Sequence, residues 1–328
     1  MGSSPIDPAK NEEGLTIRLT PFLFPPTNIL LNASEKDKVK YEGDIIRPPS
    51  EASSLLLQVT VGCSHNKCSF CPAYKEKKFR IKSSDEILED ILEAGRWRSI
   101  DKVFLCDGDA LIIPQERLVE ILGLIQTHIK GVKRVGTYAN AKSILRKTAE
   151  QLAQLREFGL GIVYLGIETG NDELLRKIRK GVTAAQMVEA GRRVKDAGIP
   201  LSVTVILGLG GGDQSTEHVN DTASILTDMD PEYASALTLM LIPGTPLYAE
   251  YESGKFTLPD KFHLLRELAC IIEKSDFSSC YFTSNHASNY LPIKARLPSE
   301  KEKTVTTIYN TIRKNDVRYL RPEYMRGF

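Results

Sequence analysis

From Leu55 onward, short apolar runs alternate with stretches in which apolar residues recur at helical spacing. This alternation is typical of βαβ units and a parallel sheet. The predicted strands cover residues 55–61, 102–106, 133–139, 161–167, 202–207 and 236–241. The predicted helical stretches between them cover residues 85–97, 114–127, 148–158, 172–197 and 216–229. Because right-handed crossovers place successive strands side by side, six such units predict an α/β fold, a partial, open TIM barrel of (β/α)6 type.

The regions before and after these units have a different composition. Residues 1–50 contain seven prolines and only short apolar patches, which predicts an extended N-terminal arm instead of long helices. Residues 51–250 form the predicted core barrel. Residues 251–328 form a C-terminal extension, which we expect to cover the open barrel and contact substrate.

The overall charge is nearly balanced, with 43 Lys and Arg against 42 Asp and Glu in 328 residues. No global basic field attracts nucleic acid or an anionic membrane, and we expect no nucleic-acid footprint. No apolar run approaches the roughly 20 residues of a membrane span. We therefore expect a soluble cytoplasmic protein in a compartment that keeps thiols reduced.

Half of the six cysteines lie within nine residues at the end of the first predicted strand, as Cys63, Cys68 and Cys71. Three thiolates on one loop can ligate three irons of a 4Fe-4S cluster and leave the fourth iron open for chemistry. The first strand ends at the carboxyl edge of the sheet, where this architecture has its active site.

Other interpretations of the cysteines remain open. Cys68 and Cys71 have zinc-knuckle spacing, although no second ligand pair follows. The C-x4-C-x2-C spacing also matches a plant-type ferredoxin with Cys106 as fourth ligand, which would make the chain an electron-transfer or structural iron-sulfur protein. The position of the loop in a β/α array argues against this, and Cys106 ends an apolar strand where a buried thiol is ordinary. Six cysteines in a chain of 328 residues argue against a disulfide framework.

Several motifs at the ends of strands resemble the radical S-adenosylmethionine (radical SAM) superfamily, in its branch with oxygen-independent coproporphyrinogen dehydrogenase, methylthiotransferases and elongator-type proteins. The resemblance covers about residues 54–250. It rests on the three cysteines, spaced one residue wider than the usual C-x3-C-x2-C, and on four motifs at strand ends. These are Asp107-Gly108-Asp109, Gly166-Ile167-Glu168-Thr169-Gly170, Leu207-Gly208-Leu209-Gly210 and Pro243-Gly244-Thr245-Pro246.

The resemblance assigns roles to individual residues. Phe70 lies where family members set the adenine of SAM, and Asp107, Gly108 and Asp109 replace a Gly-Gly-Glu-like motif that receives the methionine amine. Glu168 and Thr204 correspond to ribose contacts, and Lys180 to a position that meets the SAM carboxylate. From the residues alone, the Asp-Gly pair is equally compatible with a simple turn and Lys180 with a solvated helix.

The resemblance also implies cofactors and partners. A 4Fe-4S cluster would reductively cleave SAM, and the 5′-deoxyadenosyl radical would abstract hydrogen from an unidentified substrate. The enzyme would be oxygen-sensitive and would need an electron donor such as flavodoxin or ferredoxin. We expect no cobalamin, because the proline-rich lead-in is too short for a cobalamin-binding domain.

The C-terminal extension contains one conspicuous polar stretch, residues 283–290, after the end of a short predicted strand at Tyr281 and Phe282. Asn285 and His286 in this stretch are the candidate substrate contacts. The alternative is an ordinary polar turn, since Ser and Asn favour turns.

Overall fold

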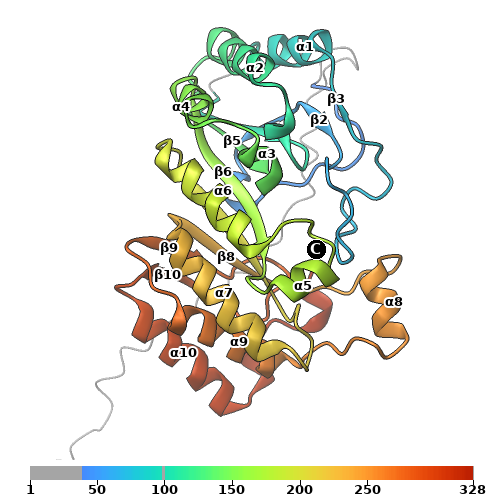
Figure 1. The fold of residues 1–328 in the computed structure, drawn as a ribbon, viewed down its shortest axis with the longest axis vertical. Helices are drawn as coiled ribbons and strands as arrows, with labels where there is room; N and C mark the ends of the chain where they lie inside the picture. The colour runs from blue at the N-terminus through green and yellow to red at the C-terminus, as the bar shows by residue number, and fades with distance from the viewer. Residues whose placement is uncertain (1–38, 98–99, 328) are drawn as a thin grey trace, which may run out of the picture. The chain divides into compact units, whose positions relative to one another are not determined.

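The computed structural model describes residues 39–97 and 100–327. Most of the predicted N-terminal arm, residues 1–38, lies outside the described residues. The described chain contains an eight-stranded sheet in the order β1-β4-β5-β6-β7-β8-β9-β10. Neighbours from β1 to β9 are parallel, and β10 is antiparallel to β9. The sheet is open, with β1 and β10 at its two edges, as expected for a partial barrel (Figure 1).

All six predicted strands are present, with shifts in their bounds. All the strands of the described chain, predicted or not, are β1 (Leu55–Gln58), β2 (Thr60–Val61), β3 (Arg80–Ile81), β4 (Lys102–Cys106), β5 (Arg134–Ala139), β6 (Leu160–Glu168), β7 (Leu201–Leu207), β8 (Tyr233–Thr238), β9 (Cys280–Thr283) and β10 (Lys294–Leu297). The first predicted strand divides at Val59, because β2 leaves the sheet and pairs with β3 as a separate antiparallel ribbon. The predicted sixth strand begins three residues early, at Tyr233. The C-terminal extension contributes β9 and β10 to the same sheet.

Ten α-helices connect the strands or follow them in the described chain. They are α1 (Ser84–Ala94), α2 (Gln115–His128), α3 (Ala141–Leu145), α4 (Ala149–Glu157), α5 (Asp172–Lys177), α6 (Ala184–Asp196), α7 (Ser215–Met229), α8 (Pro246–Glu252), α9 (Lys261–Lys274) and α10 (Lys301–Lys314). Capping boxes at Ser83, Thr148 and Thr183 fix the starts of α1, α4 and α6. The helical stretches predicted within residues 172–197 are the two helices α5 and α6, which are separated where the chain turns at Gly181, whose φ is +78°. No described helix is long and apolar enough to cross a bilayer.

The two faces of the sheet are buried differently. The outer face packs against the helices and forms the main apolar core, which includes Phe282 and Ala295 of the last two strands. A separate cluster on the inner face contains Phe104, Cys106 and Tyr164. The segment before β1 covers this part of the inner face, where the Tyr164 hydroxyl donates to buried Glu51 at 2.5 Å.

Candidate functional site

The three clustered cysteines lie on the loop that joins β2 to β3. All three are free and half-buried. The loop begins at Gly62, whose φ of +75° suits glycine, and whose N–H donates to Asp107 Oδ2 at 2.8 Å. The loop therefore starts at the carboxyl edge of the sheet, as predicted.

Two other loops hold the cysteine loop in place. The N–H of Ser69 donates to the carbonyl of Ile178 at 2.9 Å, just after α5. The carbonyl of Ser69 accepts from the N–H of Leu247 at 3.0 Å, in the first turn of α8. Thr245 caps that helix and is buried. The Pro-Gly-Thr-Pro turn therefore supports the segment that carries Cys68 and Cys71.

In the acidic motif after β4, the carboxylates of Asp107 and Asp109 accept hydrogen bonds from other groups of the protein. Asp107 Oδ2 accepts hydrogen bonds from Gln58 and Lys77, besides Gly62, while its buried Oδ1 has no partner among the described residues. Asp109 is buried and accepts from Ser64 at 2.5 Å and Ser143 at 2.6 Å. Burial raises its pKa, and the two serine hydroxyls oppose that shift.

Between these two acids, Gly108 lies against the cysteine loop. A Cβ at this position would be 3.0 Å from the Cβ of Cys63 and 2.9 Å from the ring of Tyr74. The close contact explains the glycine, because a side chain would displace Cys63. The simple-turn interpretation is thus insufficient for this position.

Glu168 and Lys180 meet in an ion pair, with 2.6 Å between Lys180 Nζ and Glu168 Oε1. Glu168 ends β6 in the left-handed conformation, with φ of +62°, where the register to β7 shifts. Gly166 leaves room for this pair, since a Cβ there would be 3.3 Å from Lys180 Nζ and closer still to the carboxylate. Thr204 is the register partner of Gly166 on β7 and is half-buried.

The ion pair and the cysteines influence one another electrostatically. Burial raises the pKa of Cys68 to about 11, and the charge of Lys180 lowers it. Burial also raises the pKa of Cys71, and the carboxylate of Glu168 adds to that shift. Burial lowers the pKa of Lys180, but Glu168 and Cys68 raise it, and the net shift is upward. Lys180 is therefore a half-buried, ion-paired group beside the cysteines and not a solvated helix residue.

Phe70 is half-buried and packs against the main core from the cysteine loop. His65 lies at the other end of that loop, where its Nε2 is 2.7 Å from the carbonyl of Arg179. A Cβ at Gly181 would meet the His65 ring at 2.8 Å and Lys142 at 2.9 Å. Glycine at position 181 is thus required both by its positive φ and by this contact.

The three half-buried thiols on one loop fit an iron-sulfur cluster. Among the described residues, no three His, Cys, Asp or Glu side chains converge to hold a single metal ion, as a zinc site requires. Thiolates of a cluster bind different irons and need not converge. Cys106 is fully buried in the inner-face cluster, and its thiol contacts the carbonyl of Phe104 at 3.5 Å. That position gives no support to Cys106 as a fourth ligand.

The loop with the predicted substrate contacts follows β9 at the same edge of the sheet. Its attachment to β8 runs through residues other than those predicted: Thr238 Oγ1 donates to Asn289 at 2.9 Å, and its N–H to Ser288 at 3.1 Å. The Asn285 side chain is exposed, and His286 bonds within its own loop, to Ser288 at 2.9 Å.

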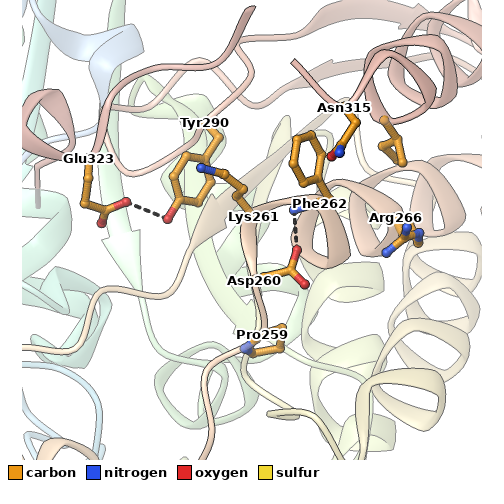
Figure 2. Close-up of a pocket in the computed structure, with 9 residues that line it drawn as sticks. Pro259, Asp260, Lys261, Phe262, Arg266, Tyr290, Asn315 and Glu323 are labelled. Atoms are coloured by element: carbon orange, nitrogen blue, oxygen red, sulfur yellow. Dashed lines mark hydrogen bonds between the residues drawn. The ribbon is translucent and has the colours of Figure 1, made fainter. Parts of the chain in front are cut away.

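A cavity of about 670 Å³ lies outside the cysteine site, around the start of α9 and the C-terminal segment. Figure 2 shows its lining, where Tyr290 donates to Glu323 at 2.7 Å and Asp260 caps α9. Neither the cysteines nor the Glu168–Lys180 pair line it.

Sequence reasoning missed the residues that support the site. Ser64, Ser143 and His65 carry no motif, and their partners are 34 to 114 residues away. Only the glycines in the motifs at strand ends gave a local signal, because glycine lets another group approach the backbone closely.

Comparisons with known proteins agree with this geometry. The Radical SAM superfamily model matches residues 57–224. Heme chaperone HemW of Bacillus subtilis is 23% identical over 198 residues, which cover 60% of this chain and 51% of HemW. A tRNA-2-methylthio-N(6)-dimethylallyladenosine synthase of Dehalococcoides mccartyi is 26% identical over 190 residues, 56% of this chain and 44% of that protein. The chain thus matches only about half the length of these relatives.

A solved structure shares the fold. The radical S-adenosylmethionine methyltransferase TsrM of Kitasatospora setae, with cobalamin and a [4Fe-4S] cluster bound, superimposes with a TM-score of 0.50 at 20% identity, over 63% of this chain and 41% of that chain. The branch named from the sequence is confirmed by these relatives. A fold neighbour with cobalamin bound leaves the expected absence of cobalamin a prediction.

Proposed function

Because the chain belongs to the radical SAM superfamily, we propose that it is a radical SAM enzyme whose Cys63, Cys68 and Cys71 hold the 4Fe-4S cluster. The family's cofactors are this cluster and SAM. The observation that carries the assignment is the hydrogen bond from Ser69 to Ile178, which joins the cysteine loop to the segment that bears Lys180 and its ion pair with Glu168. The cluster and SAM, when bound, supply a primary radical that abstracts hydrogen from substrate.

In this proposal, each polar group of the site binds one part of SAM. Lys180 has three N–H donors, so it can hold the methionine carboxylate while it stays paired with Glu168. Glu168 and Thr204, on adjacent strands, accept from and donate to the ribose hydroxyls. Phe70 packs against the adenine. The methionine amine is received by the backbone around Gly108 and by the unpartnered Oδ1 of Asp107, while Asp109 is already bonded to protein donors.

Exposed lysines beside the cysteine loop fit an acidic electron donor such as flavodoxin or ferredoxin. Lys67 and Lys78 are exposed on or just after the loop, and neither has a side-chain partner among the described residues. Opposite charges on two redox proteins raise the rate at which they associate, and added salt lowers that rate because it screens the charges. In this proposal the protein acts in the cytoplasm, is oxygen-sensitive and uses no cobalamin.

Anaerobic reconstitution with iron and sulfide, followed by dithionite reduction, tests the proposal. SAM should change the electron paramagnetic resonance signal of the reduced cluster, and 5′-deoxyadenosine should accumulate. A cluster that forms but does not respond to SAM would contradict the enzyme assignment and favour an electron-transfer protein.

A further inference from the structure

Two neighbouring rows of side chains cross the inner face of the sheet from β6 to β10. Register partners in a sheet lie side by side on one face. The first row is Gly166, Thr204, Ser235, Thr283 and Lys294. The second row is Tyr164, Ser202, Tyr233, Tyr281 and Arg296. The first row begins beside the Glu168–Lys180 pair, and both rows end in a cation on β10.

This half of the inner face is polar and open among the described residues. Tyr233 is 42% exposed and Tyr281 is 38% exposed, although both lie within a sheet. The hydroxyls of Ser235 and Thr283 are 3.0 Å apart across β8 and β9. The alternate residues of the same strands, such as Phe282, are buried against the helices. The outer face thus forms the core, and the inner face of β8 to β10 is available for a ligand.

The two cations at the end of the rows, Lys294 and Arg296, are exposed. In the described part of the chain, neither Lys294 nor Arg296 forms a side-chain hydrogen bond or ion pair. The carboxylate of Glu300 instead accepts from the backbone N–H of Arg296 at 2.6 Å. Side chains two residues apart on a strand lie about 7 Å apart on one face, so the two charges add to one positive patch.

We propose, building on the radical SAM assignment, that the inner face of β7 to β10 binds the substrate and that Lys294 and Arg296 hold an oxyanion of it, a phosphate or a carboxylate. Arg and Lys together suit such a group, since charge-assisted bonds to oxyanions are the strong ones. An apolar occupant would desolvate the hydroxyls and both cations without compensation.

The spacing of the strands sets the shape of that substrate. Thr204 on β7 and Lys294 on β10 are three strand spacings apart, about 14 Å along the sheet. The anionic group therefore lies at the β10 end, the reacting carbon at the end beside Thr204, and a polar middle between them contacts Ser235 and Thr283. A small, neutral substrate would leave the β10 end unused.

Titration calorimetry of full-length protein with pyrophosphate and with succinate, at low ionic strength, tests this inference. It is done with and without reconstituted cluster and SAM, because Lys180 is also an anion-binding group. We expect Lys294→Gln/Arg296→Gln to weaken binding of the preferred probe about tenfold or more. The charge-matched control, Lys130→Gln/Lys303→Gln, changes two exposed lysines elsewhere and should bind like the wild type. The stronger of the two probes identifies phosphate or carboxylate.

The same variants separate this inference from the proposed function. Equal probe affinity in the wild type and the β10 double variant, or no binding to the wild type, would overturn the inference. Cluster content and the response to SAM should not change in the double variant. A wild type that binds the anion but whose cluster does not respond to SAM would contradict the radical SAM assignment and leave the anion site intact.

Discussion

Ser64 and Asp109 join the cysteine loop to the segment after β4 through a hydrogen bond of 2.5 Å between Ser64 Oγ and Asp109 Oδ2. The same oxygen accepts from Ser143, and Oδ1 accepts from the N–H of Asn140. One buried carboxylate thus fixes the cysteine loop against α3.

Asp109→Ala should therefore lower the stability of the chain and should not weaken SAM binding directly. It leaves buried donors without an acceptor, and we expect the free energy of unfolding of the apo chain to fall by about 2 to 4 kcal/mol. Urea denaturation measures this, with exposed Asp101→Ala as the control. An Asp109→Ala protein with normal stability and weakened SAM binding would instead make Asp109 a ligand contact.

Cys63, Cys68 and Cys71 should each be essential for the cluster. Alanine at any of them removes a thiolate that binds its own iron, so iron and sulfide content after anaerobic reconstitution should fall to background. Cys106→Ala should keep full iron content and lose about 1 kcal/mol of stability from a small cavity in the inner-face cluster. Loss of iron in Cys106→Ala would revive the ferredoxin-like hypothesis.

Glu168→Gln and Lys180→Gln should weaken SAM binding while cluster content stays constant. Each loses a charge-assisted bond, worth about 1.5 to 3 kcal/mol, so the Kd for SAM should rise about 10- to 100-fold. Equilibrium binding to reconstituted protein checks this, and Lys130→Gln is the matched control. An unchanged Kd in both variants would remove the pair from the SAM site.

Stability should depend on pH through Glu267, a buried carboxyl on α9. Burial raises its pKa to about 7 from the usual 4.5, although Ser215 and the N–H of Gly208 donate to it. Because the folded chain holds this proton more tightly than the unfolded chain, the stabilisation is full below about pH 4.5 and is lost as the pH rises through about 7.

Glu267→Gln stays uncharged and should remove this dependence. At about pH 8 the variant should be about 1 to 3 kcal/mol more stable than the wild type, and at low pH nearly equal to it. Urea midpoints at several pH values measure the effect, with exposed Glu217→Gln as control. A constant difference between Glu267→Gln and the wild type at all pH values would show that Glu267 does not titrate in this range.

The loop after β9 gives a prediction about substrate. Asn285→Ala and His286→Ala should spare the cluster and SAM cleavage without substrate, but abolish deuterium transfer from the true substrate into 5′-deoxyadenosine. Asn289→Ala is the structural comparison, since it loses bonds to Thr238 and to the carbonyl of Ala236 and should lower stability. Full deuterium transfer in both the Asn285 and His286 variants would reduce that part of the loop to a polar turn.

The sequence by itself determined the order of the strands, the place of the cysteine loop and the family. These follow from local signals: apolar runs with the length of buried strands, helical periodicity between them, and three cysteines within nine residues at the end of the first run. Such signals depend on neighbours along the chain, and so they can be recognised without coordinates.

Only the tertiary structure decided what the polar residues do. The sequence left Lys180 compatible with a solvated helix, yet the turn at Gly181 and the missing side chain at Gly166 place it against Glu168. Asp107 and Asp109 looked like ligand contacts, yet they accept bonds from the cysteine loop and from α3.

The same holds for the inner face of the sheet, where Lys294 and Arg296 came from a segment without any motif. Register, set by hydrogen bonds between strands, aligns Lys294 with Thr204, 90 residues earlier in the chain, and Arg296 with Ser202 in the neighbouring row. Whether a charge is paired, buried or free depends on which distant strands share a face. That is fixed by the packing of the outer face against the helices and not by the residues beside it in sequence.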